Sequence, residues 1–99
     1  MVHFALMIGY IMAATIITRF TSPYGNDVRS TLASLYGVYA RSAIDCSIRC
    51  RSESKCRGAN YVPGTGYCEM IKVLTTAGDI EASIGTRYIL RPGMYAETN

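Results

Sequence analysis

Histidine is almost missing from this sequence, and its scarcity excludes several kinds of active site. The single histidine, His3, lies at the extreme N-terminus. Serine and cysteine nucleophiles are usually activated by a nearby imidazole, which the folded part of this chain cannot supply. Zinc sites typically combine Cys-x2-Cys pairs with histidine, and no Cys-x2-Cys is present. We therefore expect no enzyme, no metal and no cofactor.

Charge is sparse and unevenly spread. The formal net charge is +3 at pH 7, and the segment from Arg41 to Arg57 holds five basic and two acidic residues, a difference of +3, so the rest of the chain balances. This density falls well below that of a dedicated nucleic-acid-binding domain, so we expect no nucleic-acid partner. The sequence also lacks an Asn-x-Ser/Thr acceptor for N-glycosylation and any internal repeat.

An apolar segment near the N-terminus predicts a secretory signal peptide over residues 1–20. Phe4 to Ile17 carries no charge and is apolar apart from Gly9 and Thr15. As a helix it would span about 21 Å, short of the roughly 30 Å hydrocarbon core of a bilayer. We expect the protein to be secreted, with its cysteines in an oxidising environment and no further membrane contact. An uncleaved anchor and an apolar helix of the fold are the alternatives.

The rest of the chain has room for one small domain. Residues 21–26, Thr-Ser-Pro-Tyr-Gly-Asn, have the composition of a linker, residues 27–92 are expected to form the domain, and residues 93–99 a C-terminal tail. Domains of this size seldom bury enough apolar surface to fold without disulfides, a metal or a partner. The four cysteines are therefore central to the fold.

The first half of the domain predicts strands followed by a helix. Val28 to Tyr39 is rich in Val, Leu, Tyr and Thr, which favours one or two short strands broken at Gly37, with a helix as the alternative. Ser42 and Asp45 match a capping box, so we expect a helix from there to about Glu53.

The second half predicts a hairpin and a last strand. Cys56–Val62 and Tyr67–Leu74 have strand composition, and Pro63–Gly66 between them is a strong turn signal. Thr76–Gly85 is polar and small, and Thr86–Leu90 is β-prone. The expected fold class is α+β, with one short helix packed on a small antiparallel sheet and stapled by two disulfides.

Four cysteines allow three pairings. A bond between Cys46 and Cys50 is disfavoured, because residues four apart on a helix have nearly parallel Cβ vectors. Nested and interleaved pairings with Cys56 and Cys68 both remain open at this point.

The cysteine pattern resembles that of the PAN/apple family of extracellular binding modules. The segments that carry the resemblance are Cys46–Cys50, Lys55–Tyr61 and Tyr67–Met70. The resemblance implies the nested pairing, Cys46 with Cys68 and Cys50 with Cys56. It also implies a non-catalytic module that binds extracellular glycans or proteins. Many members have a third disulfide joining their ends, which this chain lacks, so we expect its ends either to fray or to be held by packing alone.

Four basic residues form the candidate ligand site: Arg49, Arg51, Lys55 and Arg57. Guanidinium groups make bidentate contacts with sulfate and carboxylate, so a cluster at the helix end suits a sulfated or sialylated glycan. The alternative is a solvated basic face without a ligand.

Asp79 and Glu81 are the residues that most resemble a catalytic carboxylate pair. We expect them to lie on the solvated face of a strand, because alternate strand residues point the same way.

The tyrosines have several possible roles. Tyr61, Tyr67 and Tyr88 are expected in or near the core with the phenol at the rim, while Tyr24 and Tyr95 are expected to be exposed. An aromatic platform for stacking sugars is an alternative use.

Together these features predict a secreted, non-catalytic binding module for an extracellular glycan or protein. One alternative is a cationic disulfide-rich effector of the toxin or antimicrobial type, although cysteine makes up only about 5% of the domain, against about 8–10% in compact disulfide scaffolds. The other is that the chain is a fragment of a larger multi-domain extracellular protein.

Overall fold

The computed structural model describes residues 21–93 and confirms the α+β class. The predicted signal peptide and Tyr95 lie outside the described residues. Along the chain the elements are β1 (Val28–Ser30), β2 (Ser34–Tyr39), α2 (Ala43–Ser52), β3 (Gly58–Val62), β4 (Tyr67–Ile71), the short 3₁₀ helix η1 (Ala77–Asp79), β5 (Ile80–Ala82) and β6 (Arg87–Leu90).

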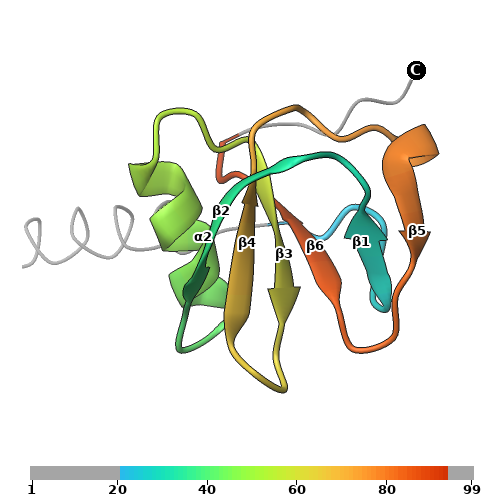
Figure 1. The fold of residues 1–99 in the computed structure, drawn as a ribbon, viewed down its shortest axis with the longest axis horizontal. Coiled ribbons are helices and arrows are strands. Elements are labelled where there is room, and N and C mark those ends of the chain that lie inside the picture. Colours follow the sequence, from blue (N-terminus) through green and yellow to red (C-terminus); the bar gives the residue numbers. More distant parts are fainter. Residues whose placement is uncertain (1–20, 94–99) are drawn as a thin grey trace, which may run out of the picture.

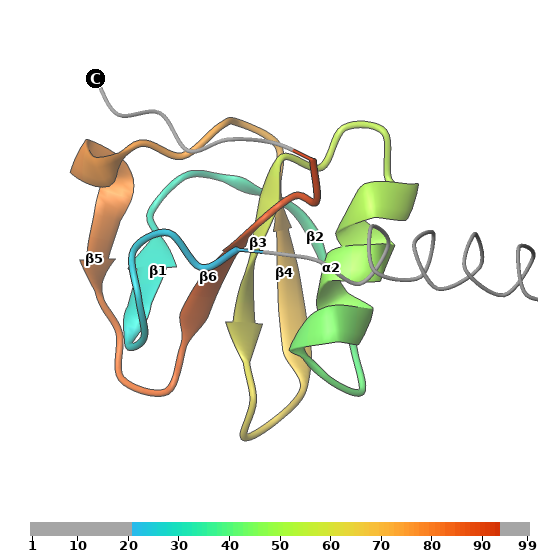
Figure 2. The same ribbon diagram turned by 180° about the vertical axis from the view of Figure 1, so that it is seen from behind.

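The strands form a four-stranded sheet and a separate two-stranded ribbon. The sheet has the order β2-β4-β3-β6, and β1 pairs with β5 to make the ribbon. All neighbouring strands are antiparallel. In Figures 1 and 2 the helix α2 lies at one side of the sheet and the β1–β5 ribbon at the other. The helix packs mainly over β3 and β6.

Two hydrophobic clusters occupy the two faces of the sheet. The cluster on the helix side includes Cys46, Cys50, Cys56, Ala59, Tyr61, Cys68, Met70 and Ile89. The cluster on the ribbon side has Ile71, Tyr88 and Leu90 at its centre, with Tyr24, Leu32, Leu74 and Ile80 packed against them. Successive strand residues point to opposite faces, so β6, which is covered on both faces, is nearly all apolar.

Both disulfides have the nested pairing that the PAN/apple resemblance implied, so that prediction is confirmed. Cys46 is bonded to Cys68, which ties α2 to β4, and Cys50 is bonded to Cys56, which ties the end of α2 to the start of β3. All four sulfurs belong to buried residues. By loop-closure entropy the bonds are worth about 3 and about 2 kcal/mol, a large share of the stability of so small a domain.

The ribbon is joined to the sheet through one buried side-chain amide. Asn60 Oδ1 accepts from the backbone N–H of Ser30 at 2.8 Å, and Asn60 Nδ2 donates to the Ser30 carbonyl at 3.0 Å. The Ser30 hydroxyl in turn shares a 2.7 Å hydrogen bond with the hydroxyl of Thr75. Asn60 therefore pairs with β1 as a neighbouring strand would, and the amide, carbonyl and hydroxyl of Ser30 all have partners.

The predicted strands are confirmed in part, and two details of them are wrong. Residues 28–39 form two strands, not a helix, but the break falls at residues 31–33 and Gly37 lies inside β2, opposite Glu69. A Cβ at Gly37 would collide with the ring of Tyr67, so glycine is needed here for close packing, not for a turn. The hairpin strands are also shorter than predicted, because β3 begins at Gly58 and β4 ends at Ile71.

The predicted capping box is only half correct. The Ser42 hydroxyl accepts from the Asp45 amide at 3.0 Å, as expected, and α2 starts at Ala43, directly after Ser42. The Asp45 carboxylate does not reach back to Ser42, but accepts from the amide of Arg41 at 2.9 Å. The box still anchors the first turn, with the carboxylate satisfying a donor one residue earlier.

Residues 21–26 contact the domain. The carbonyl of Thr21 accepts from the amide of Leu90 at 2.9 Å, so the two ends of the described chain lie side by side. Tyr24 is half-buried, its ring centroid lies 6.1 Å from that of Tyr88, and its hydroxyl donates to the Thr75 carbonyl. The prediction that Tyr24 is exposed is therefore wrong. The prediction that the Tyr88 phenol lies at a rim is also wrong, because this residue is fully buried.

Candidate functional site

Three basic residues meet at one end of the sheet. The Arg57 amide donates to the Ile71 carbonyl at 2.8 Å, and the Arg91 amide donates to the Arg57 carbonyl at 3.1 Å. These bonds continue the register in which Gly58 lies opposite both Ile71 and Leu90. Lys72 and Arg91 directly follow β4 and β6, and Arg57 directly precedes β3 between them, so the three residues form a row across this end of the sheet.

Arg91 fixes the end of α2 through four backbone carbonyls. Its Nη1 donates to Glu53 and Cys56 at 2.8 Å each and to Cys50 at 3.4 Å, and its Nη2 donates to Arg51 at 2.9 Å. The last carbonyls of a helix have no partner within the helix and form the negative end of its dipole, so a guanidinium is well suited to them. The loop between the bonded cysteines is consequently held at both its ends.

The structure brings three of the four predicted site residues to this place. Arg51, Lys55 and Arg57 lie on the end of α2 and the following loop, and all three are exposed. We define the basic cluster as these three residues together with Lys72 and Arg91. Sequence analysis missed Lys72, which was expected inside the strand Tyr67–Leu74, and Arg91, which follows the last residue of the last strand. That both residues lie at the same end of the sheet as Arg57 became clear only once the order and register of the strands were known.

One carboxylate lies within the basic cluster. Glu53 accepts from the Lys55 amide at 3.2 Å and from the Tyr36 hydroxyl at 3.1 Å. The pKa of Glu53 is lowered, chiefly by the bond from the Lys55 amide and then by that from Tyr36. Glu53 is therefore ionised at neutral pH and offsets one of the five positive charges.

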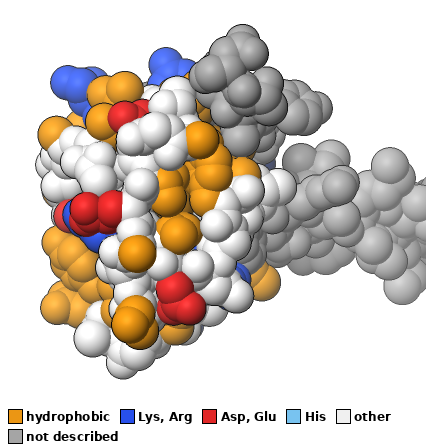
Figure 3. Space-filling model, turned by 90° about the vertical axis from the view of Figure 1, so that its right-hand side faces the viewer, with side chains coloured by type: hydrophobic (Ala, Val, Ile, Leu, Met, Phe, Trp, Pro, Cys, Tyr) orange, Lys and Arg blue, Asp and Glu red, His pale blue; other side chains and the backbone are white. Residues whose placement is uncertain are grey.

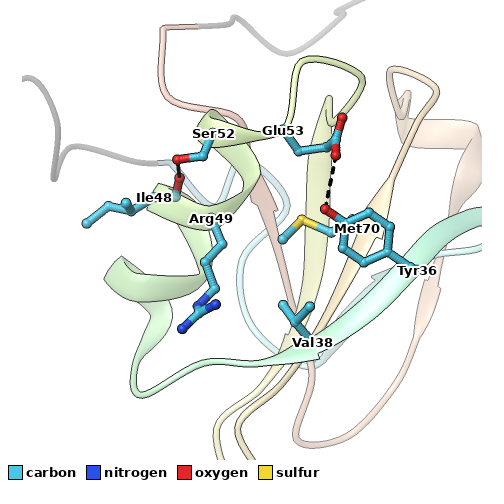
Figure 4. A pocket seen from close by; sticks show the side chains of 7 residues that line it. All are labelled: Tyr36, Val38, Ile48, Arg49, Ser52, Glu53 and Met70. Atoms are coloured by element: carbon cyan, nitrogen blue, oxygen red, sulfur yellow. Dashed lines mark hydrogen bonds between the residues drawn. The ribbon is translucent and has the colours of Figure 1, made fainter.

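Arg49, the fourth predicted residue, points elsewhere. It is two positions from Arg51 on the helix, which separates their directions by about 200°. Its Nε lies 3.3 Å from Asp45 Oδ2, an ion pair one turn back along α2. Figure 4 shows its side chain extending away from Glu53. Arg49 is thus separate from the other three site residues.

Arg49 instead lines a groove between α2 and the edge strand β2. The groove has a volume of about 310 Å³ and is lined by Tyr36, Val38, Ile48, Arg49, Ser52, Glu53 and Met70. It exists because α2 covers β3 and β6 more than β2. Figure 4 shows Arg49 at one end and Glu53, bonded to Tyr36, at the other, with Val38 and Met70 between them.

Asp79 and Glu81 do not form a pair. Asp79 lies in η1, not on a strand, and its carboxylate accepts from the amide and hydroxyl of Thr76 at 3.0 and 2.9 Å. Glu81 lies in β5 and accepts from Arg29 Nη1 at 2.8 Å. The expectation that both line one strand face is therefore wrong, and each carboxylate has a structural partner of its own.

The tyrosines divide between the core and the surface. Tyr61 and Tyr88 are buried, whereas Tyr39 and Tyr67 are exposed and pack edge to face with ring centroids 5.6 Å apart. Both exposed rings lie at the strand ends nearest the β3–β4 turn, far along the sheet from the basic cluster.

Among residues 21–93, no helix is long and apolar enough to cross a bilayer, and no three His, Cys, Asp or Glu side chains gather as metal ligands would. In comparisons with known proteins, no protein-family model and no curated protein matches the chain.

Proposed function

We propose that this chain is a secreted, non-catalytic binding module of the PAN/apple type, and that it binds a sulfated or carboxylated extracellular glycan at the basic cluster. The two nested disulfides and the helix held against an antiparallel sheet support the PAN/apple assignment. The basic cluster supports the choice of an anionic ligand.

The row of Lys72, Arg57 and Arg91 carries the proposal. Like charges placed on directly opposite strand positions destabilise a sheet, so a chain has little structural reason to gather them. Arg91 is explained by its bonds to the helix end. The side chains of Arg51, Lys55, Arg57 and Lys72 make no ion pair within residues 21–93. They remain available to an anion.

The cluster is also held in place before any ligand arrives. Arg91 and the Cys50–Cys56 bond fix the backbone that carries Arg51, Lys55 and Arg57. A held backbone reduces the entropy lost on binding. Each exposed ion pair contributes only about 0–1 kcal/mol, so binding needs several cations together and must weaken as salt rises.

Retention on a heparin column tests the proposal. We expect the wild type to be retained at low salt and the double variant Arg57→Gln/Lys72→Gln to elute at clearly lower salt. The control double variant Arg41→Gln/Arg87→Gln changes the net charge equally but lies outside the cluster, so it should elute close to the wild type. Arg49→Gln alone should also elute like the wild type.

Two results would overturn the anion site. One is equal loss of retention in both double variants, which would mean that only net charge matters. The other is no retention of the wild type at low ionic strength. In the first case the quadruple variant of Arg49, Arg51, Lys55 and Arg57 to Gln would elute as its net charge alone dictates.

Secretion is tested separately, by expressing the chain in a secreting cell and sequencing the product from its N-terminus. We expect a product in the medium that has lost the apolar segment. A membrane-bound product that still begins with Met1 would contradict the extracellular location.

A further inference from the structure

The sheet face opposite α2 is covered only in part. The ribbon and residues packed with it cover Ile71, Tyr88 and Leu90. The cross-strand row of Tyr39, Tyr67 and Val62 lies on the same face but toward the β3–β4 turn. Tyr39 is 70% exposed and Tyr67 is 37% exposed. An aromatic surface is therefore left open beside the ribbon.

The ring of Tyr67 is held in a fixed position on this surface. It lies over Gly37, its diagonal neighbour on β2, where any Cβ would collide with it. Tyr39 packs against it edge to face at an interplanar angle of 65°. Glycine inside a strand costs stability, and here it allows the ring to lie on the backbone. We call Tyr39 and Tyr67 the tyrosine platform.

A partly free carboxylate lies next to the platform. Glu69 is two residues beyond Tyr67 on β4, on the same face, and opposite Gly37. Its Oε1 accepts from Asn60 Nδ2 at 2.9 Å and lies 3.5 Å from Arg29 Nη2. Its Oε2 has no partner among the described residues 21–93. An acceptor is thus held at the edge of the aromatic surface with one oxygen unused.

Arg29 completes the edge of the platform from the ribbon. It contacts Glu69 and also pairs with Glu81 at 2.8 Å, so it is fixed between two carboxylates. Figure 3 views the molecule from the side of the ribbon and shows acidic and basic side chains in contact at this surface. Fixed charged groups beside an aromatic ring offer hydrogen bonds at little entropic cost.

We propose that the tyrosine platform and Glu69 form a subsite for one pyranose ring of an oligosaccharide. The apolar C–H face of the sugar stacks on the ring of Tyr67, the Tyr39 ring contacts the edge of the sugar, and a sugar hydroxyl donates to Glu69 Oε2. This inference rests on the proposed glycan-binding function and adds a second contact point, on the face of the sheet away from α2.

The size of the platform favours a sugar over a protein partner. An aromatic side chain buries about 150–250 Å², so two rings offer less than the roughly 800 Å² that each partner contributes to a stable protein interface. A single sugar ring with a few polar groups matches what is present. Binding of one ring should be weak, with a dissociation constant of about a millimolar.

Amide chemical-shift mapping with methyl pyranosides tests the inference. The probes are the methyl glycosides of glucose, galactose, mannose and N-acetylglucosamine, added to the ¹⁵N-labelled domain. We expect at least one probe to shift the amides of Gly37, Tyr67 and Glu69 in a saturable way. Tyr67→Leu should weaken its binding by about fivefold or more, because the flat ring face is lost. Glu69→Gln should also weaken it.

The matched control is Tyr36→Leu. Tyr36 lies on the same strand as Tyr39 and is about as exposed as Tyr67, but it faces the groove beside α2, so its loss should leave sugar binding unchanged. Tyr39→Leu gives a second platform variant in case Tyr67→Leu does not fold. The outcome that overturns the inference is either no saturable shift with any probe or equal weakening by Tyr36→Leu and the platform variants.

The two proposals fail in different ways. If the protein is retained on heparin but no pyranoside shifts the platform amides, the sugar subsite is contradicted and the anion site is not. If a pyranoside binds at the platform but heparin does not retain the protein, the anion site is contradicted and the sugar subsite is not. The variant Arg57→Gln/Lys72→Gln should not change pyranoside binding, because these residues lie at the opposite end of the sheet.

Discussion

Asn60 pairs with both backbone groups of Ser30, accepting its N–H at 2.8 Å and donating to its carbonyl at 3.0 Å. We predict that Asn60→Ala lowers the free energy of unfolding by about 3 kcal/mol or more, because it leaves two buried backbone groups unpaired at about 1–3 kcal/mol each. Urea denaturation measures this. Asn26→Ala, which removes an exposed acceptor of Arg87, is the control and should cost less than about 0.5 kcal/mol.

Arg91 joins the end of α2 to the end of β6. We predict that Arg91→Ala costs about 2–3 kcal/mol, since charged hydrogen bonds to several carbonyls are lost together. Arg91→Lys should recover only part of this, because an ammonium cannot reproduce the planar fork. Urea midpoints for both variants decide the matter. Full recovery by lysine would mean that charge alone is required.

Gly37 and Tyr67 are predicted to be energetically coupled. Gly37→Ala should cost about 1–3 kcal/mol in the wild type, because the new methyl group displaces the Tyr67 ring. In the Tyr67→Ala background the same change should cost little, since alanine is otherwise better than glycine in a strand. A double-mutant cycle of unfolding free energies gives the coupling directly. Additive costs would contradict the packing described here.

The two disulfides should differ in their contribution. We predict that replacing Cys46 and Cys68 by alanine costs about 3 kcal/mol, and that replacing Cys50 and Cys56 costs about 2 kcal/mol. The difference follows from loop length, since the bonds span 22 and 6 positions. Thermal unfolding of each pair variant tests the order. If both variants are unfolded under native conditions, the domain needs both bonds to fold and the predicted order is wrong.

Stability is predicted to fall in acid. The pKa of Asp45 is lowered chiefly by the amide of Arg41 and then by Arg49, that of Glu53 by the amide of Lys55, and that of Asp79 by the amide and hydroxyl of Thr76. A carboxyl whose pKa is lowered by folding stabilises the native state above its unfolded pKa, about 4. That stabilisation is lost as pH falls through the lower folded value.

Thermal midpoints measured from about pH 6 down to about pH 2 check this prediction. The midpoint should hold near neutrality and drop below about pH 4. In the double variant Asp45→Asn/Asp79→Asn the drop should be smaller. A midpoint that rises on acidification would contradict the sign derived from these contacts.

Local signals in the sequence were sufficient for the elements near the cysteines. Ser42 marked the start of α2 because a hydroxyl cap acts over three residues, and the Pro63–Gly66 turn marked the hairpin because its residues favour tight turns. The same reasoning placed a strand break at Gly37, which was wrong. Glycine signals a break where it provides backbone freedom, but here it provides room for a ring from a neighbouring strand, which local sequence does not reveal.

The candidate sites depended on pairings between distant parts of the chain. The sequence by itself determined the α+β class and the basic segment from Arg49 to Arg57, since both follow from short-range patterns and charge. Only the tertiary structure decided that Lys72 and Arg91 join Arg57 while Arg49 turns away, and that Tyr67 lies on Gly37 beside Glu69. These neighbours are set by strand order and register, which many distant contacts determine together.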